Sequence, residues 1–116
     1  MTYEEWEEQV PDEFRNDPLW KMEAYRLGLF LHNLAWEDCG QMMRDRRGRV
    51  IADQLIRSAG SISANIEEGF GRGFGKQFAQ FLRYSLGSAR ETRGWYYRGH
   101  KLLSSEVAHN QQKGAC

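Results

Sequence analysis

Apolar side chains recur every three or four residues along three stretches of the chain, which is the period of a helix with one buried face. The clearest stretch lies between residues 50 and 70. Its apolar face consists of Ile51, Leu55, Ala59, Ile62, Ile66 and Phe70. We therefore predict a helix from about Val50 to Phe70, with this face directed at the core.

A longer and more apolar pattern precedes this helix. We predict that it begins at Asp17-Pro18, because aspartate can accept the free N–H groups and proline fits the first helical position. The pattern continues to about Met43, which corresponds to roughly 26 residues and about 40 Å. Its two apolar stripes consist of Met22, Tyr25, Leu29 and Trp36, and of Leu27, Phe30, Leu31 and Leu34. Two stripes indicate a helix that lies deep in a bundle or also faces another subunit.

The third pattern predicts a helix from Lys76 to about Leu103. Its heptad positions, several of them small, are Phe78, Leu82, Ser85, Ala89, Thr92, Tyr96, Gly99 and Leu103. The polar residues 44–49 predict a loop before the second helix. A chain reversal after that helix is predicted by its glycines, which tolerate the left-handed backbone that ends a helix. They are Gly69, Gly71, Gly73 and Gly75.

The chain before and after these patterns is simpler. Thr2 and Glu5 are spaced as a capping box, which predicts a short acidic helix that Pro11 stops. The last thirteen residues have almost no apolar periodicity and are predicted to be disordered. We therefore predict an all-α, antiparallel up-down helical bundle with three long helices and a short N-terminal helix. We divide the chain into a short N-terminal helix with its linker (residues 1–16), the helical bundle domain (17–103) and a polar tail (104–116).

The formal net charge is zero, with 16 basic and 16 acidic residues, but the two signs are segregated. Residues 1–43 carry ten acidic against three basic residues, and residues 44–103 carry twelve basic against five acidic residues. A basic second part can bind a polyanion, or it can be solvated or paired with the acidic first helix. The candidate nucleic-acid-binding residues are Arg44, Arg46, Arg47, Arg49, Arg72, Lys76, Arg83, Arg90 and Arg93.

Other candidate chemistry is weak. The glycine-rich run after the second helix could cradle a phosphate, but it lacks a preceding strand and a Gly-Lys-Ser/Thr sequence. Glu67 and Glu68 are adjacent and point about 100° apart on a helix, so we expect Glu68 to pair with Arg72 instead. Trp95-Tyr96-Tyr97 could stack on single-stranded bases, although aromatics at helical spacing more often fill a core.

We predict no catalytic residue, no metal site and no cofactor. His32, His100 and His109 are dispersed, and no histidine has the helical spacing of a metal site. Cys39 is expected to be a small core residue, and a reducing cytoplasm is the default for a chain without a disulfide framework. The sequence contains no run of 18 apolar residues, so we predict no membrane span.

The second helix and the start of the third carry a family pattern. It combines an SI-NI-EG-G core with a downstream FL stretch and a GS-E sequence. The residues that carry it are Gln54, Leu55, Arg57, Ala59, Ser61, Ile62, Asn65, Ile66, Glu68, Gly69, Gly71, Arg72, Phe78, Phe81, Leu82, Gly87, Ser88 and Glu91. On these residues the chain resembles the four-helix-bundle family of the 23S rRNA intervening-sequence proteins. That group includes the accessory variability determinant of diversity-generating retroelements.

The resemblance implies an antiparallel bundle, a ring-shaped homo-oligomer, usually a pentamer, and no enzymatic activity. For the retroelement members it implies binding of nucleic acid and of a reverse transcriptase. This chain departs from the family in its neutral net charge. It also departs in the residues after Leu103, which are too polar for the usual fourth helix.

We therefore expect a non-enzymatic homo-oligomer that binds RNA or a ribonucleoprotein partner through basic residues of 44–103. The alternative is a protein–protein scaffold without nucleic-acid binding. Within the motif we expect Asn65 to fix helix register through a hydrogen bond. Asn65→Ala should then disturb folding or assembly, and reversal of Arg83 and Arg90 to glutamate should abolish RNA binding.

Overall fold

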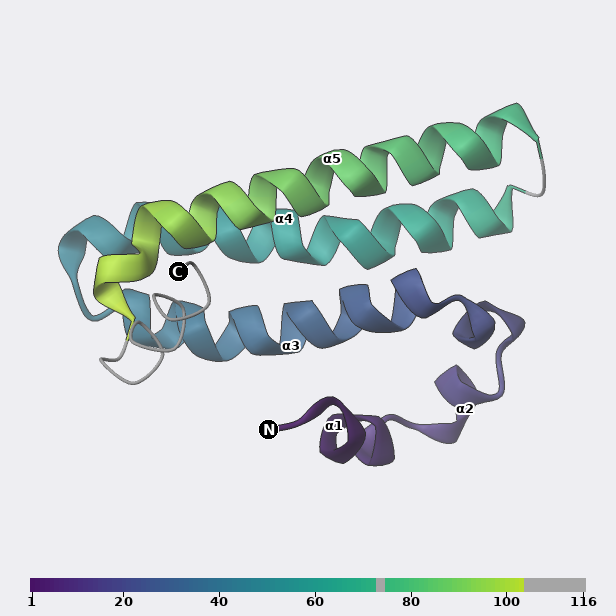
Figure 1. The fold of residues 1–116 in the computed structure, drawn as a ribbon, viewed down its shortest axis with the longest axis horizontal. Coiled ribbons are helices and arrows are strands. Elements are labelled where there is room, and N and C mark those ends of the chain that lie inside the picture. Colours follow the sequence, from purple (N-terminus) through teal and green to yellow (C-terminus); the bar gives the residue numbers. More distant parts are fainter. Residues whose placement is uncertain (73–74, 104–116) are drawn as a thin grey trace, which may run out of the picture.

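A computed structural model describes residues 1–72 and 75–103, and in this part of the chain all regular structure is helical. The elements are α1 (Tyr3–Gln9), α2 (Asp12–Arg15), η1 (Pro18–Lys21), α3 (Glu23–Met42), α4 (Arg46–Gly71), α5 (Lys76–Gly99) and η2 (His100–Leu102). The three long helices alternate in direction (Figure 1). The predicted all-α fold with packed long helices is confirmed.

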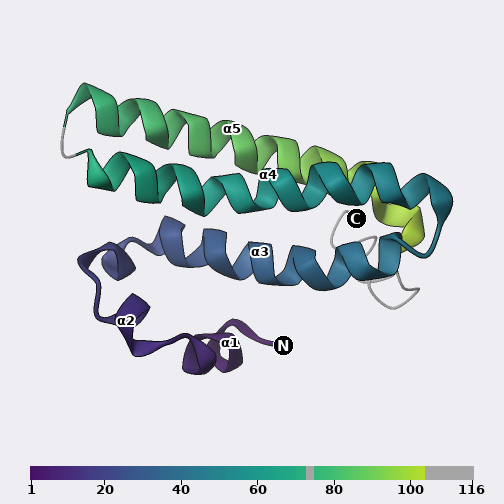
Figure 2. The same ribbon diagram turned by 180° about the vertical axis from the view of Figure 1, so that it is seen from behind.

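Helix α4 is the centre of the bundle. It packs against both α3 and α5, whereas α3 and α5 approach each other little (Figures 1 and 2). Each side chain as large as leucine that is fully buried contributes about 1.5–3 kcal/mol. The main core consists of Ala35, Cys39, Met42, Ala52, Leu55, Ala59 and Leu103. The α4 face predicted from the sequence is therefore confirmed, except that Phe70 is 41% exposed.

Cys39 lies in this core as predicted. Its Sγ donates to the Ala52 carbonyl oxygen at 3.3 Å. Burial, and secondarily the nearby Asp38 carboxylate, raises the pKa of the Cys39 thiol to about 11. A thiol with this pKa is almost entirely protonated at neutral pH, so it packs as a small apolar group.

The predicted start of the first long helix was wrong. Asp17 does cap a helical turn, because its Oδ1 accepts from the Leu19 N–H at 2.8 Å. That turn is the 3₁₀ helix η1, and Met22 then has extended backbone (φ −82°, ψ 112°). Helix α3 consequently begins at Glu23, five residues after Pro18, and it is 20 residues long.

The predicted loop at 44–49 exists but was predicted too long, since only residues 43–45 lie between α3 and α4. Helix α4 already begins at Arg46, because the Asp45 carboxylate accepts from the Arg47 N–H at 2.8 Å and caps it. The polar composition of this turn hid its helical structure. The prediction missed an aspartate cap followed by arginines, which are good helix formers.

Not all of the glycines predicted to reverse the chain after α4 lie in the turn. Gly71 is the last residue of α4, and Gly75 has a left-handed φ of 81° immediately before α5. Gly69, in contrast, lies inside α4 and is buried, and a Cβ there would lie 2.7 Å from the Phe81 Cβ. Gly69 is therefore a close-packing position and not a turn residue. Gly73 lies outside the described residues.

The N-terminal elements pack along the side of α3 that faces away from α5 and α4 (Figure 1). The N-cap half of the predicted capping box is confirmed, since the Thr2 Oγ1 accepts from the Glu5 N–H at 3.2 Å. Trp6 is buried against Trp20 and Phe30, with ring centroids 6.0 and 5.3 Å apart. Helix α2 was not predicted. The expected disordered tail at 104–116 lies outside the described residues.

Candidate nucleic-acid interface

Four arginines surround the junction of α3 and α4. We call these four arginines and Lys101 the arginine end. Arg44 lies in the connection, and Arg46, Arg47 and Arg49 are exposed on the first turn of α4. The remaining residue of that turn is Gly48, which is buried. The Cβ of any larger residue there would overlap the Met42 carbonyl and lie 2.7 Å from the Leu102 Cδ1.

This packing explains why the arginines point outward. Gly48 brings the start of α4 against the end of α3 and against Leu102, so the other side chains of the turn are left facing solvent. The same contact places Leu102 beside the first turn of α4, and thus sets the exposed Lys101 at this end of the bundle. Lys101 is not among the candidate residues predicted from the sequence, so the sequence analysis missed this neighbourhood.

The electrostatics of the arginine end favour an anion. The helix dipole makes the start of α4 positive, and the first turn adds arginines with no acidic residue among them. Asp45 is the carboxylate beside them. Hydrogen bonds from the Arg47 side chain and backbone lower the pKa of Asp45 to about 2. Cations at this position are disfavoured by about 0.3–1 kcal/mol each, which a bound phosphate would offset.

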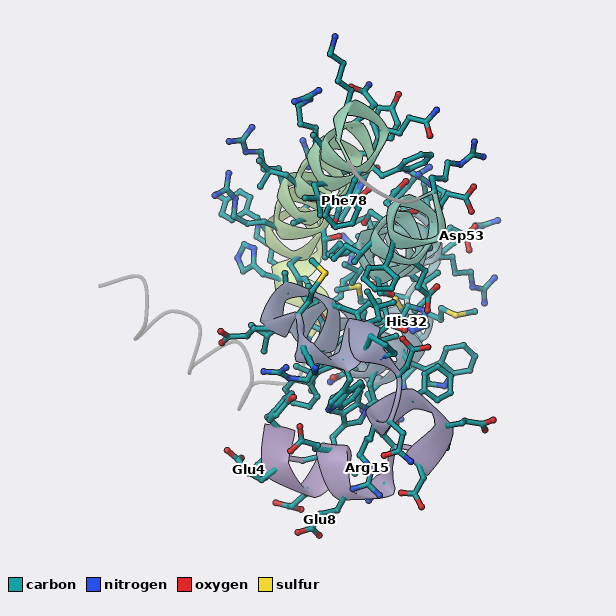
Figure 3. The ribbon with its side chains drawn as sticks, turned by 90° about the vertical axis from the view of Figure 1, so that its right-hand side faces the viewer. Glu4, Glu8, Arg15, His32, Asp53 and Phe78 are labelled. Carbon is teal, nitrogen blue, oxygen red and sulfur yellow. The ribbon has the colours of Figure 1, made fainter. Side chains whose placement is uncertain are left out.

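The remaining candidate residues lie elsewhere. Arg83, Arg90 and Arg93 are exposed on α5. Figure 3 shows nitrogen-tipped side chains projecting from α5 on the side of the molecule opposite Glu4 and Glu8 of α1. The basic and acidic surfaces are thus on opposite sides of the bundle.

Arg72 and Lys76 lie at the other end, beside the α4–α5 connection. The α4 helix separates them from the arginine end by about 35–40 Å, at 1.5 Å per residue over its 26 residues. The predicted pairing of Glu68 with Arg72 is confirmed by an Oε1–Nη2 distance of 2.8 Å. The Arg72 guanidinium also lies 5.5 Å from the centre of the Phe81 ring. The structure therefore divides the candidate set among two ends and one helix face.

The acidic first part does not neutralise the basic second part within the described residues. The ion pairs found there are Arg15–Asp12, Arg47–Asp45, Arg57–Glu91 and Arg72–Glu68. Each pair lies wholly within one part. The two parts are joined instead by tyrosines, since the Tyr25 hydroxyl donates to Glu67 and the Tyr96 hydroxyl to Asp38, both at 2.6 Å. Burial is the main reason why the pKa of each tyrosine is raised.

The three residues of the aromatic triplet Trp95-Tyr96-Tyr97 differ in whether they pack on the core or are exposed to solvent. Trp95 packs on the main core, and its indole Nε1 donates to Glu91 at 3.0 Å. Tyr96 packs on the same core. Tyr97 is 75% exposed and stacks on His100 with ring centroids 5.3 Å apart. Of the three, only Tyr97 offers a free ring face for a base.

The motif residues have structural roles within α4, but one prediction was wrong. The Asn65 Nδ2 donates to the Ser61 carbonyl of its own helix at 2.8 Å, so this bond does not fix the register between helices. Hydrogen bonds to α5 do so instead. The Ser85 hydroxyl donates to the Ile62 carbonyl at 2.8 Å, and the Thr92 hydroxyl lies 3.0 Å from the Ser58 hydroxyl. In the sequence, the small residues Ser85 and Thr92 at heptad positions of the third helix were the signal that could have predicted these bonds.

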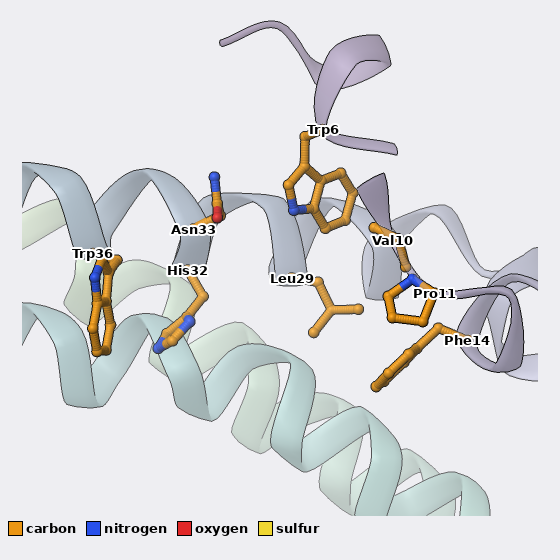
Figure 4. A pocket seen from close by; sticks show the side chains of 8 residues that line it. All are labelled: Trp6, Val10, Pro11, Phe14, Leu29, His32, Asn33 and Trp36. Carbon is orange, nitrogen blue, oxygen red and sulfur yellow. The ribbon is translucent and has the colours of Figure 1, made fainter. Parts of the chain in front are cut away.

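A hollow of about 400 Å³ opens between α1, α2 and α3 (Figure 4). Its lining is mostly apolar and includes Trp6, Phe14 and Leu29, with His32 beside Trp36 at its other end. Among the described residues no three His, Cys, Asp or Glu side chains are grouped to hold a metal ion.

The described residues form a small bundle of three long antiparallel helices, and the motif in α4 serves helix packing. A family model described as 23S rRNA-intervening sequence protein matches residues 21–112. This chain belongs to that family. No curated protein and no solved structure matches the chain. None of the helices described for residues 1–72 and 75–103 is long and apolar enough to cross a membrane.

Proposed function

We propose that this chain is a non-enzymatic, homo-oligomeric helical-bundle protein that binds structured RNA through the arginine end. The observation that carries the proposal is the convergence of Arg44, Arg46, Arg47, Arg49 and Lys101 around the N-terminus of α4. Asp45 is the acidic residue among them, so the local charge is strongly positive although the whole chain is neutral. The family's name links it to ribosomal RNA genes, and the proposal extends that link to RNA as a ligand.

The geometry favours recognition of backbone phosphates over reading of bases. Arginine forks bind phosphate oxygens bidentately, whereas the Arg47 N–H at the start of α4 already donates to the Asp45 carboxylate. Tyr97 can stack an unpaired base next to these phosphates. The arginines of α5 would extend the contact along one side of the bundle. Such an interface prefers folded RNA with a dense phosphate surface and an accessible loop.

Self-association would increase this effect, because each added copy repeats the arginine end. The family resemblance implies a ring of five copies, in which weak single contacts combine into one stronger interaction. A ribonucleoprotein or a reverse transcriptase is then a further candidate partner, recognised through its RNA. We place this activity in the cytoplasm, where Cys39 would persist as a free thiol.

Salt dependence of binding tests the proposal. A fluorescently labelled structured RNA is titrated with the protein at several salt concentrations, and the association constant is measured by anisotropy. About five phosphate contacts should give a slope of about −3 to −5 in a plot of log K against log salt. Absence of binding at low salt, or binding that salt does not weaken, would overturn the proposal. The sequence alone led us to expect that reversal of Arg83 and Arg90 to glutamate abolishes RNA binding. Because both residues lie along α5 and not at the arginine end, we now expect this reversal to weaken binding only partly.

A protein–protein scaffold is the second candidate, and the exposed apolar side chains favour it. Trp36 on α3 is 66% exposed, and Met43, directly after α3, is 53% exposed. They line a hollow of about 290 Å³ between α3 and α4 together with Ile56. A stable oligomer with no RNA affinity at low salt would support the scaffold and exclude the first candidate.

A further inference from the structure

An apolar groove runs between α3 and α5 over α4. Its volume is about 320 Å³, and Ile62 of α4 lies at its base. Leu27 on α3 forms one edge of the groove, and Leu82 and Leu86 on α5 form the other edge. The α5 edge from Leu82 to Ala89 is about 10 Å long, at 1.5 Å per residue, so the groove extends over about two helical turns.

The groove is open among the described residues. Leu27 is 48% exposed and Leu86 is 53% exposed. Helices α1 and α2 do not cover them, because both pack on the side of α3 that faces away from α5 (Figure 1). In residues 104–116 the largest aliphatic side chain is that of Val107, so this segment offers few apolar side chains for the groove. Exposed leucines on both edges of one groove are typical of a site that binds an apolar surface.

The α5 edge of the groove is also basic. Three exposed arginines lie three residues before, four residues after and seven residues after Leu86, which places them on the same side of α5. They are Arg83, Arg90 and Arg93. Arg90 and Arg93 make no ion pair with any described residue. A ligand that carries carboxylates beside its apolar residues would therefore pair with this edge.

The combination of leucines and arginines favours a protein helix over a nucleic acid. Phosphates can pair with the arginines, but they leave Leu27 and Leu86 exposed to water. An amphipathic helix presents apolar side chains every three or four residues, so it can place them in the groove while its polar edge meets the arginines. Helices α3, α4 and α5 would then pack around it at the usual distance of about 8–10 Å between helix axes.

The exposed surfaces of another copy of this chain are less suitable. Its exposed apolar residues Met43 and Val50 lie next to Arg49, whose Nε donates to the Met43 carbonyl at 3.4 Å. Placing these residues in the groove would bring Arg49 against the arginines of α5. The acidic helix α1 is not free to bind there, since its Trp6 is already buried against Phe30 of α3. The charges therefore favour a different protein as the occupant.

We propose that the α3–α5 groove binds an acidic amphipathic helix of a partner protein. Apolar residues of that helix pack on Leu27, Ile62 and Leu86. Carboxylates along one of its edges pair with Arg90 and Arg93. Because an isolated helix of two turns is marginal in water, the helix belongs to a folded partner or forms on binding. The groove lies along the side of the bundle, apart from the arginine end, so this binding does not depend on RNA.

Synthetic helical peptides test the proposal with the full chain. Each is alanine-rich, about 18 residues long and carries leucines every three or four residues. The residues beside the leucines are glutamates in one peptide and lysines in the other. Fluorescence anisotropy should show that the acidic peptide binds at micromolar concentrations and that the lysine peptide binds at least tenfold more weakly. Equal affinities, or no binding of the acidic peptide, would overturn the proposal.

A substitution at the edge of the groove tests its location. Leu86→Asp should weaken binding of the acidic peptide by at least about 30-fold. The matched control is Tyr84→Asp, a position on the same helix with 49% exposure that does not line the groove. Its dissociation constant should stay within threefold of wild type, and thermal melts check that both variants fold. Equal weakening by the two substitutions would contradict the assigned site.

A charge reversal tests the role of the arginines. Arg90→Glu with Arg93→Glu should weaken binding of the acidic peptide about tenfold and strengthen binding of the lysine peptide by about the same factor. A variant that is merely damaged would lose affinity for both peptides. Loss of both affinities, or no change in either, would overturn the proposed pairing.

The other possible occupants and the RNA proposal have separate readouts. If Leu86→Asp dissociates an oligomer in sedimentation analysis, the groove holds a second copy and the proposal fails. It also fails if Val107→Asp raises the affinity for the acidic peptide at least tenfold, because residues 104–116 would then occupy the groove. Arg46→Glu with Arg49→Glu should abolish RNA binding and leave peptide affinity within threefold. RNA binding without peptide binding would overturn this inference alone, and peptide binding without RNA binding would overturn the RNA proposal alone.

Discussion

The two ends of the bundle carry similar basic residues in different surroundings. At the arginine end Asp45, the residue before α4, pairs with Arg47, and the first turn of α4 itself carries no acidic residue. At the opposite end, which we call the turn end, Arg72 is paired with Glu68. Glu13, Asp17 and Glu67 line a hollow of about 590 Å³ next to it. A count of basic residues therefore does not identify an anion site, and the acidic neighbours decide whether one exists.

The largest expected difference in stability is between alanine substitutions of a glycine at each end of the bundle. Gly48→Ala at the arginine end places a Cβ against the Met42 carbonyl, so the free energy of unfolding should fall by about 1–3 kcal/mol. Gly71→Ala at the turn end is the control, since no atom lies within 4 Å of the added Cβ. Denaturant unfolding should show the second variant unchanged or slightly stabilised. Equal losses would mean that the arginine end is not held by this close contact.

The tyrosine bonds that join the acidic and basic parts should also differ. Tyr96→Phe leaves the half-buried Asp38 carboxylate unpaired and should cost about 1–3 kcal/mol. Tyr25→Phe leaves the exposed Glu67 carboxylate, which water can solvate, so the cost should be about 1 kcal/mol. The two bonds are distant and should contribute additively in a double variant. A strongly non-additive result from chemical denaturation would show that the parts are coupled in another way.

Asp45 gives the arginine end a specific pH dependence. Its pKa falls from 3.8 to about 2 on folding because of Arg47, so its stabilising effect is complete only above about pH 5 and is lost as the pH falls toward 2. Asp45→Ala should lower the melting temperature at pH 7, and the difference from wild type should shrink between pH 4 and pH 2. Thermal melts at several pH values measure this. A difference that is independent of pH would contradict the assigned cap.

The smallest expected effect comes from removing acidic charge at the turn end. Glu67→Gln with Glu68→Gln frees Arg72 and should raise RNA affinity only a few-fold, because few basic residues are gathered there. The exposed Glu68–Arg72 pair contributes at most about 1 kcal/mol, discounted for solvent screening, so the fold should persist. Anisotropy titrations and a melt check both statements. A large gain in affinity would show that the turn end is a masked RNA site.

Periodicity in the sequence was sufficient to predict the three long helices and the buried face of α4. It failed at the helix starts, because the start of α4 depends on one Asp45 cap in a polar run and η1 depends on a local 3₁₀ turn. The site was predicted as a list of charges. The contact of Gly48 with Leu102 groups Lys101 with the arginines, and this depends on the relative lengths of α4 and α5. No local pattern encodes such a distance.

Asn65 shows the same limit inside the family motif. Its amide was predicted to bond across helices, but the acceptor is the Ser61 carbonyl one turn earlier in α4. A side chain on a helix can satisfy itself locally, and a sequence pattern does not distinguish the two outcomes. The effect of Asn65→Ala should accordingly be a local loss of at most about 1 kcal/mol.

A matched pair of charge reversals tests the central claim most directly. Arg46→Glu with Arg49→Glu at the arginine end, and Arg72→Glu with Lys76→Glu at the turn end, change the net charge by the same amount. RNA affinity is measured by anisotropy at one low salt concentration. We predict that the first variant loses about 100-fold in affinity and that the second loses less than tenfold. Equal losses, or a greater loss at the turn end, would contradict the assignment of RNA binding to the arginine end.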